Sequence, residues 1–327
     1  MKILVIGAGG MLGGKLVAKL AASGAIGGRP ITGVVRNDVV LAPPPPPAAF
    51  AIETDIGDLS SEGVAAKLVA AKPDIIFHLA AVVSGEAEAD FEKGYRVNLV
   101  GTQNLLEAIR AQGGSYSPRL VFTSSIAVFG APFPEAFGDE FLTAPLTSYG
   151  TQKAICELLI SDYSRRGFVD GMALRMPTVC VRPGLPNKAA SGFFSNIIRE
   201  PLAGKEAILP VDSSVRHWHA SPRAATQFLV RAAEMGGAAL GNRRALTLPG
   251  LSCTVAEQLE ALERVAGAKA VARVKHVPDA TIQRIVAGWP RNFDAARAKA
   301  LGFSSEATFD EIIRVHIADE LGGKLPD

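Results

Sequence analysis

The chain has 327 residues, more than one hydrophobic core usually supports, which predicts a large domain with a smaller second lobe. A hydrophobic fraction of 48%, a charged fraction of 20% and a net charge of +2 are typical of a globular enzyme and argue against binding to nucleic acid or an anionic membrane. Three cysteines without paired spacing argue against a disulfide framework, and the lack of a signal pattern or long apolar run favours a cytoplasmic protein.

Short apolar runs alternate with amphipathic stretches through the first half of the chain. Strands are expected near residues 3–6, 34–35, 50–53, 75–79, 120–123 and 172–175. Helices are expected near residues 12–23, 61–71, 91–112 and 148–166. The five prolines at 43–47 predict an exposed polyproline loop. This alternation predicts an α/β fold with a Rossmann-type, doubly wound parallel sheet.

The pattern loosens after about residue 176. Proline, glycine and short segments dominate until the helices expected at 255–265, 280–287 and 309–317. We therefore predict a first domain over residues 1–175 and a smaller lobe over residues 176–327, with some segments returning to the first domain. The lobe is expected over the carboxyl edge of the sheet, where open α/β sheets bind ligands.

A glycine-rich pattern joins the first strand to the first helix. It reads Gly7-Ala8-Gly9-Gly10-Met11-Leu12-Gly13, or G-x-x-G-x-x-G. Gly7 allows a tight turn, Gly10 lets the backbone approach a pyrophosphate, and Gly13 lets helix and strand pack closely. The helix N-terminus at Met11 and Leu12 offers N–H groups to phosphates. The position of the pattern favours a dinucleotide site in residues 1–175 over an ordinary glycine-rich turn.

The residues after the second and third strands bear on the choice of cofactor. An acidic residue at the end of the second strand holds the adenosine ribose hydroxyls, and Asp38 at that position favours NAD. Arg36 leaves NADP as an alternative, because an arginine there can hold a 2′-phosphate; otherwise it is a solvated surface charge. Asp55 and Ile56 are candidate adenine contacts, with a simple strand-end turn as the alternative.

Two further patterns predict the chemistry. Tyr149 and Lys153 have the spacing Y-x-x-x-K, which puts both on one face of the helix expected at 148–166. An ammonium one turn away stabilises a phenolate, which suits acid–base catalysis at neutral pH. Ser125, at a strand end, can hydrogen-bond the reacting oxygen. Each pattern alone fits a surface pair or a loop start, but their order after the glycine loop predicts a nicotinamide-dependent oxidoreductase.

Four more motifs occur in a characteristic order. They are His78-Leu79-Ala80-Ala81, Val97-Asn98-Leu99-Val100-Gly101-Thr102, Ser124-Ser125-Ile126-Ala127-Val128-Phe129-Gly130 and Leu174-Arg175-Met176-Pro177-Thr178-Val179. With them the chain resembles, over essentially its whole length, the extended short-chain dehydrogenase/reductase superfamily, which includes nucleotide-sugar epimerases and dehydratases.

That resemblance implies site residues. It implies that the backbone of Leu79, Ala80 and Ala81 lines the cofactor, that Asn98 shapes the site and that Pro177 meets the nicotinamide. It implies that Tyr149 and Lys153 contact NAD, and that Ser125 and Tyr149 contact the substrate. His78 is interpreted as a hydrogen-bonded strand-end histidine without a chemical role. No metal is expected.

Two positions depart from the nucleotide-sugar members. Thr178 stands where their strand-end motif carries an asparagine, and Arg216-His217-Trp218-His219-Ala220 stands where they have R-D-[FY]-[IV]-H-V. An arginine fork suits a carboxylate as well as a phosphate, so Arg216 is predicted to bind a small acid, with a surface ion pair as the alternative. Residues 248–252, 285–290 and 293–298 are similar to a branch acting on small sugar acids. This similarity implies oxidation of the C2 hydroxyl of a four-carbon aldonate.

Two other functions remain open at this point. A nucleotide-sugar epimerase or dehydratase would retain its NAD during turnover, and an NAD-sensing regulator would use the same fold without catalysis. The presence of Tyr149 and Lys153 argues against the regulator. As in many members of the superfamily, the helices near 102–111 and 148–161 are expected to pair in a homodimer.

Overall fold

The computed structural model describes residues 1–40, 43–184 and 190–325, and the chain divides into two compact units. Unit 1 comprises Met1–Val128, Thr147–Arg175 and Thr226–Leu246, and unit 2 comprises Phe129–Leu146, Met176–Ala225 and Thr247–Asp327. The chain therefore passes between the units several times. Among the described residues, no helix is long and apolar enough to cross a membrane.

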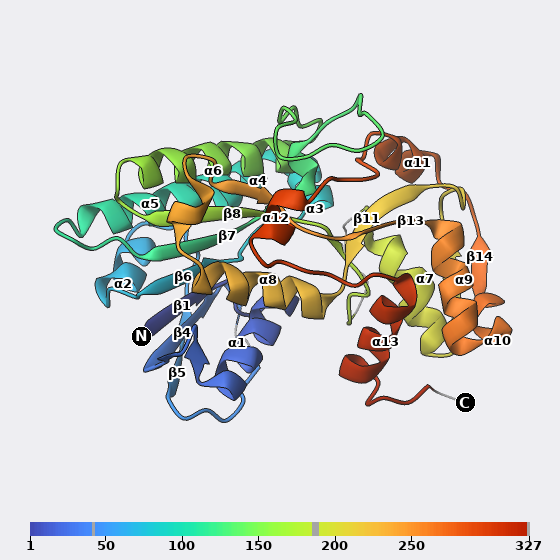
Figure 1. The fold of residues 1–327 in the computed structure, drawn as a ribbon, viewed down its shortest axis with the longest axis horizontal. Helices are drawn as coiled ribbons and strands as arrows, with labels where there is room; N and C mark the ends of the chain where they lie inside the picture. Colours follow the sequence, from blue (N-terminus) through green and yellow to red (C-terminus); the bar gives the residue numbers. More distant parts are fainter. Residues whose placement is uncertain (41–42, 185–189, 326–327) are drawn as a thin grey trace. The chain divides into compact units, whose positions relative to one another are not determined.

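Unit 1 is built on a seven-stranded sheet with the order β12-β8-β7-β6-β1-β4-β5 (Figure 1). Its strands are β1 (Lys2–Ile6), β4 (Gly33–Asp38), β5 (Ala51–Ile56), β6 (Ile75–His78), β7 (Arg119–Ser125), β8 (Asp170–Met176) and β12 (Ala245–Thr247). The pairings β5–β4, β4–β1, β1–β6 and β6–β7 are parallel. The strand order reverses between β1 and β6, where such sheets bind ligands. The predicted Rossmann-type sheet is confirmed.

Helices cover both faces of this sheet. They are α1 (Met11–Ser23), α2 (Val64–Ala70), α3 (Ser84–Ala89), α4 (Phe91–Gly94), the π-helix η1 (Tyr95–Val100), α5 (Gly101–Ala111), the 3₁₀ helix η2 (Ile126–Val128), α6 (Ser148–Arg165) and the 3₁₀ helix η3 (Gly237–Leu240). A short hairpin, β2 (Ala25–Ile26) and β3 (Arg29–Pro30), follows α1. Leu4 and Ile6 belong to a core cluster with residues of α5 and α6, and Ile3 and Val5, which are also buried, alternate to the opposite face of the sheet.

The prediction of one continuous α-helix over residues 91–112 is wrong. Residues 91–112 form α4, η1 and α5 instead of a single α-helix. A π-helical turn contains one more residue than an α-helical turn, and such turns are frequent at functional sites. Asn98 lies within η1. All the residues concerned are compatible with an α-helix, so nothing in the local sequence indicates the change. Residues 43–47 lie in no helix or strand, as the proline run predicts.

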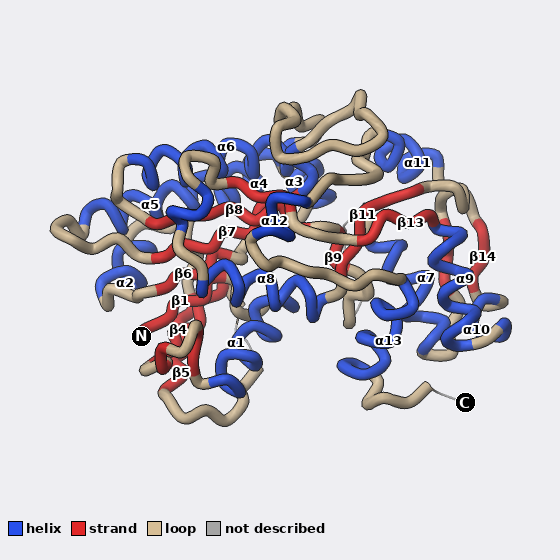
Figure 2. Tube along the Cα trace, in the orientation of Figure 1, coloured by secondary structure: helices blue, strands red, loops and turns tan. Residues whose placement is uncertain are grey.

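Unit 2 combines two small sheets with helices (Figure 2). One sheet contains β9 (Thr178–Val179), β11 (Arg216–Ala220) and β13 (Leu251–Thr254), and the other pairs β10 (Ala207–Leu209) with β14 (Val274–His276). Its helices are α7 (Gly192–Leu202), α9 (Val255–Ala266), α10 (Ala268–Val271), α11 (Ala280–Ala287), α12 (Ala296–Ala300) and α13 (Phe309–Glu320). The helices α9, α11 and α13 are those predicted from the sequence.

Two long helices were not predicted from the sequence. They are α7 and α8 (Pro222–Glu234), of which the residues from Thr226 onward belong to unit 1. Proline at the start of α8 suits the first turn of a helix, because its missing N–H would have no partner there. In α7 the buried Phe194, Ile197 and Ile198 have helical spacing, and Pro201 comes only near the helix end. The prolines therefore obscure a pattern that was present.

Candidate active site

The glycine loop is held between the ends of β4 and β6. Gly7 has a φ of 88°, and a Cβ there would come within 2.5 Å of the Ala80 nitrogen. A Cβ on Gly13 would come within 2.2 Å of the Gly7 oxygen. The nitrogens of Leu79 and Ala80 both donate to the Ile6 carbonyl, at 2.8 and 3.1 Å. The structure thus brings together the predicted glycines and the backbone that follows β6.

The start of α1 fits the diphosphate of NAD. Gly10 is the N-cap, and among the described residues no side chain caps this helix end and no acidic residue lies in its first turn. A Cβ on Gly10 would meet only the Gly7 oxygen at 3.4 Å, so the protein leaves open space at this position. The N–H groups at Met11 and Leu12 therefore begin a helix without a negative partner, as an anion requires.

Asp38 lies at the end of β4 and contacts the glycine loop. Its Oδ2 accepts a hydrogen bond from the Gly9 nitrogen at 2.8 Å, and its Oδ1 accepts from the Val39 nitrogen at 2.7 Å. This carboxylate is half-buried and lies beside the open start of α1. The position is the one predicted for the residue that binds the adenosine ribose.

Arg36 points into the protein. Its Nη1 donates to the Pro43 carbonyl at 2.7 Å, its Nη2 donates to Thr54 Oγ1 at 2.6 Å, and the residue is only 6% exposed. A guanidinium buried in this way is turned away from solvent and cannot reach a 2′-phosphate without moving. The geometry therefore favours NAD over the NADP alternative.

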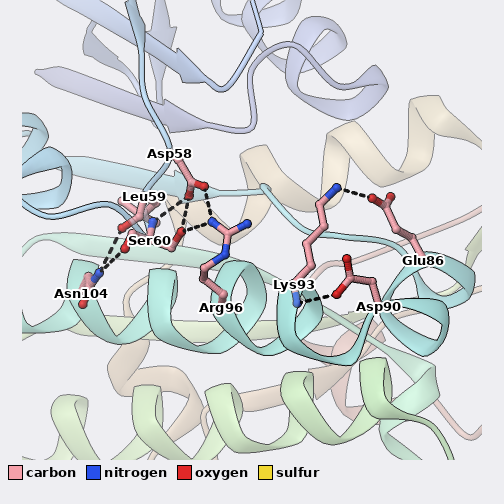
Figure 3. Close-up of polar contacts among 8 residues, drawn as sticks. All are labelled: Asp58, Leu59, Ser60, Glu86, Asp90, Lys93, Arg96 and Asn104. Carbon is pink, nitrogen blue, oxygen red and sulfur yellow. Dashed lines mark hydrogen bonds and ion pairs between the residues drawn. The ribbon is translucent and has the colours of Figure 1, made fainter.

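The segment after β5 is attached to the helical layer by polar contacts (Figure 3). Asp58 accepts hydrogen bonds from Ser60 Oγ at 2.6 Å and from Arg96 Nη1 at 2.9 Å. Burial alone would raise the pKa of Asp58, but these bonds hold it below its usual value. Asn104 Nδ2 donates to the Leu59 carbonyl at 3.3 Å. These contacts support the loop that follows the predicted adenine-binding residues. No pattern in the sequence indicated these polar contacts.

Asp55 and Ile56 precede that segment. The Asp55 carboxylate forms an ion pair with Lys67 of α2, and the side chain of Ile56 is 58% exposed. The exposed apolar surface of Ile56 is compatible with stacking on an adenine.

Lys93 connects α3 to α4 (Figure 3). Its Nζ lies 2.6 Å from Glu86 Oε1, and its backbone nitrogen donates a hydrogen bond to Asp90.

Lys153 is buried beneath Tyr149. Its Nζ donates to the Thr123 carbonyl at 2.8 Å, lies 4.4 Å from the centre of the Phe122 ring and lies 5.7 Å from the centre of the Tyr149 ring. Burial lowers the pKa of Lys153 to about 8. Tyr149 is half-buried at the start of α6. The structure therefore brings the predicted pair together, with the ammonium close to the phenol.

The other predicted polar residues of unit 1 connect these elements. Ser125 ends β7, two residues after Thr123, and its Oγ accepts from the Ala127 nitrogen at 3.1 Å. Asn98 Oδ1 accepts from the Val82 nitrogen at 2.8 Å, and its Nδ2 donates to Gln152 Oε1 at 2.7 Å. Asn98 thus links the loop after β6, which contains Ala81, to the helix that carries Lys153.

His78 has the neutral structural role expected of it. Its Nε2 lies 2.9 Å from Thr102 Oγ1, and burial, with a smaller effect of Lys153, lowers its pKa to about 3. Two polar neighbours of Lys153 were not predicted from the sequence. Gln152 bonds to Asn98, and Glu157 lies one helical turn beyond Lys153. The i, i+4 spacing of Lys153 and Glu157 was the available signal.

The remaining candidates lie in unit 2. Thr178 Oγ1 is 2.7 Å from His217 Nε2. Arg216 donates to the Ser252 carbonyl at 3.0 Å and lies 3.2 Å from the Glu257 carboxylate, with 37% of its side chain exposed. Pro177 is buried between β8 and β9. Arg216 thus makes the ion pair that was its alternative interpretation, while its exposed part remains accessible.

The family follows from these observations together with a sequence comparison. The profile of the "NAD dependent epimerase/dehydratase family" matches residues 3–226. The chain belongs to this family and is an NAD-dependent oxidoreductase. The glycine loop, Asp38 and the Tyr149–Lys153 pair all lie within the matched region.

Individual relatives are similar over the full length. A D-erythronate dehydrogenase of Cupriavidus necator is 48% identical over 98% of both chains. A D-erythronate dehydrogenase of Haemophilus influenzae is 40% identical over 97% of this chain and 99% of its own. A crystal structure described as a nucleoside-diphosphate-sugar epimerase from Agrobacterium tumefaciens is 58% identical, with a TM-score of 0.97, and the match covers 100% of this chain and 96% of that one.

The contacts of Asp38 and Arg36 predict how cofactor preference will respond to substitution. Asp38→Asn keeps an acceptor for Gly9 but removes the charge that repels a 2′-phosphate. We expect a loss of about 1.5–3 kcal/mol, roughly ten- to a hundredfold in kcat/KM for NAD, and a gain for NADP. Adding Thr54→Val, which frees one side of Arg36, should increase the NADP activity further. Steady-state kinetics with both cofactors measures this.

Thr54→Val alone is the control, since Asp38 still repels the extra phosphate and the NAD preference should persist. An unchanged preference in the Asp38→Asn variant would contradict the role assigned to Asp38.

Proposed function

We propose that this protein oxidises the C2 hydroxyl of D-erythronate to 2-dehydro-D-erythronate with NAD, with unit 1 binding the cofactor and unit 2 the substrate. The observation that carries the proposal is the similarity, over almost the whole of each chain, to two D-erythronate dehydrogenases. The buried lysine beside Tyr149 supports the reaction type, because an alcohol oxidation needs a group that accepts the hydroxyl proton.

Each catalytic residue has one task in this proposal. Tyr149 accepts the proton of the C2 hydroxyl, and the Lys153 ammonium stabilises the resulting charge on Tyr149 during the cycle. Ser125 donates a hydrogen bond to the substrate oxygen and fixes its orientation. Bound NAD supplies the acceptor for the C2 hydride. The hydrogen atoms are thereby balanced, since one proton goes to Tyr149 and one hydride to the cofactor.

A nucleotide-sugar epimerase is the second candidate, and the description of the Agrobacterium structure favours it. The two functions differ in a measurable way, because an epimerase regenerates its NAD in every cycle while a dehydrogenase releases NADH. Thr178 and the sequence around Arg216 differ from the nucleotide-sugar pattern, and this supports the dehydrogenase. An NAD-sensing regulator would produce neither NADH nor an epimerised sugar.

The test is a panel of four-carbon sugar acids and nucleotide sugars, assayed with NAD for net NADH formation. We expect D-erythronate to give NADH. In the Tyr149→Phe variant turnover should fall by about 10²- to 10⁴-fold, as is typical for loss of an acid–base group, while NAD binding is retained. Conversion of a nucleotide sugar without NADH release would replace the proposal by the epimerase, and near-normal turnover of Tyr149→Phe would refute the assigned base.

Arg216 is the proposed carboxylate-binding residue. Its side chain is partly exposed, and its guanidinium already pairs with one carboxylate, that of Glu257. A substrate carboxylate could therefore reach Arg216 and take the place of Glu257. A planar fork binds a carboxylate through two hydrogen bonds, and a lysine cannot reproduce this geometry. Thr178 is proposed as a second polar contact to the acid.

We expect Arg216→Ala to lower kcat/KM for the acid by an amount that corresponds to about 2–5 kcal/mol, with little change in NAD affinity. Arg216→Lys should also be impaired. Comparison of the aldonate with its uncharged amide isolates the carboxylate contact, because only the acid should lose activity. Arg264→Ala is the control, since Arg264 is an exposed arginine paired with Asp310 in the same unit. Equal acid-to-amide ratios in wild type and Arg216→Ala would exclude the contact.

The protein is further proposed to be a cytoplasmic homodimer that pairs through α5 and α6. Apolar side chains are exposed on these helices and just before them: Leu158 on α6 is 72% exposed, and Val100, next to α5, is 40% exposed. Exposed leucine at the middle of a helix is often covered in an assembly.

A charge in this surface should prevent association. We expect Leu158→Asp to be a folded monomer by light scattering, while the wild type is a dimer at the same concentration. Leu142→Asp, at a site 81% exposed in unit 2, should leave the dimer intact. A wild-type monomer would refute the proposed interface.

A further inference from the structure

Glu157 is a buried carboxylate on α6 that contacts the ends of two strands. Its Oε1 accepts from Ser124 Oγ at 2.6 Å, next to the end of β7, and its carboxylate accepts from Nε and Nη2 of Arg175 at distances from 2.8 to 3.2 Å, near the end of β8. Glu157 is 5% exposed and Arg175 is 6% exposed. Because Ser124 directly precedes Ser125, Glu157 holds α6 to the strand end that carries the proposed substrate contact.

The same carboxylate lies close to Lys153. The two residues are one helical turn apart on α6 and share a face of the helix. The titratable and charged groups around the Tyr149–Lys153 pair come from several elements: Cys156 and Glu157 on α6, His78 on β6, Arg175 on β8 and the exposed Glu88 of α3, which accepts from the Ser148 nitrogen.

Most of these groups either keep one charge state near neutral pH or have little electrostatic effect on Tyr149 and Lys153. Burial keeps His78 uncharged, and burial likewise raises the pKa of Cys156 so that it stays a thiol. Glu88 is exposed, so solvent screens it. Among these groups, the remaining buried charges near Lys153 are those of Glu157 and Arg175, which pair with and offset each other.

The opposite ends of the same two strands provide a matched comparison. There Asp170, the first residue of β8, accepts from Arg119 Nε of β7 at 3.0 Å and from Arg244 Nη1 at 3.0 Å. The Asp170 side chain is 31% exposed. Asp170 thus connects β7 with β8 at these ends, whereas Glu157 of α6 contacts both Ser124 of β7 and Arg175 of β8 at the ends that carry the proposed chemistry.

We propose that Glu157 and Arg175 are positioning residues of the active site, which hold Ser125 and α6 in place and keep the buried charge around Tyr149 and Lys153 balanced. This inference rests on the proposed role of Tyr149 as the base. A pair that only stabilised the fold could equally consist of two neutral side chains, because replacing a buried ion pair by neutral groups is often tolerated. A charge-balancing pair instead makes a prediction with opposite signs for its two members.

The predicted signs follow from electrostatics. Glu157→Gln keeps an acceptor for Ser124 and leaves the Arg175 charge unbalanced, and a positive charge favours the Tyr149 phenolate. Its formation should move to lower pH, by roughly one unit. Arg175→Gln leaves the negative charge of Glu157 and should move the phenolate to higher pH by a similar amount. The double variant removes both charges and should return to within about 0.3 unit of the wild type.

The measurement is an ultraviolet titration of the phenolate in the full-length, NAD-loaded protein. Subtracting the same variant with Tyr149→Phe isolates Tyr149 from the other tyrosines. The pH profile of kcat/KM, with whichever substrate reduces NAD, should shift in parallel. Asp170→Asn is the control and is expected to lower the melting temperature without moving the titration.

Each outcome decides the inference. Shifts of opposite sign that cancel in the double variant support it. Equal shifts, or none, in variants that retain the wild-type circular dichroism would overturn it and leave a structural ion pair. If one single variant does not fold, the other single variant and the double variant decide: a shift of the predicted sign that the double variant abolishes supports the inference, and any other result overturns it. The titration needs no substrate, so failure of D-erythronate as substrate would affect only the proposed function.

Discussion

Lys153 buries an ammonium group against the Thr123 carbonyl and the face of Phe122. Burying a charge is costly unless hydrogen bonds and aromatic or charged neighbours compensate for it. These neighbours belong to the end of β7, so α6 must dock on that strand in one register. The same register keeps Lys153 close to the Tyr149 ring and brings Gln152 to Asn98. The buried cation therefore constrains where α6 lies, together with the contacts of Glu157.

The glycine loop imposes a second constraint, of steric origin. Gly7 and Ala80 approach so closely that a side chain on residue 7 would overlap the backbone after β6. This contact occurs where the strand order reverses, and it leaves the start of α1 open. Electrostatics acts on the same place, because Asp38 is tied to the loop while Arg36 is turned away from it. The proposed selection of NAD therefore depends on two side chains whose directions the backbone spacing does not determine.

The difference between local sequence patterns and long-range contacts explains which features could be predicted from the sequence. Strands with continuous apolar runs and the glycine, Y-x-x-x-K and strand-end serine patterns depend on local chemistry, so they could be located from residue types and spacing. The direction of Arg36 depends on Pro43 and Thr54, which lie 7 and 18 residues further along the chain, in a loop and in the neighbouring strand. The Glu157–Arg175 pair joins a helix to a strand, and the π-turn at Asn98 accompanies bonds to Val82 and Gln152. Such features require tertiary contacts, which a single sequence does not contain.

The path of the chain connects the second unit directly to the residues proposed to be catalytic. Ser125 lies three residues before the chain leaves unit 1, and Tyr149 lies two residues after it returns. The intervening segment Phe129–Leu146 is anchored within unit 2, where Asp139 pairs with Arg297 and Phe137 packs on Phe293. The stretch that contains Phe293 and Arg297 also carries the resemblance to the sugar-acid branch. The segment between Ser125 and Tyr149 is therefore held by the part of the chain in which that resemblance lies.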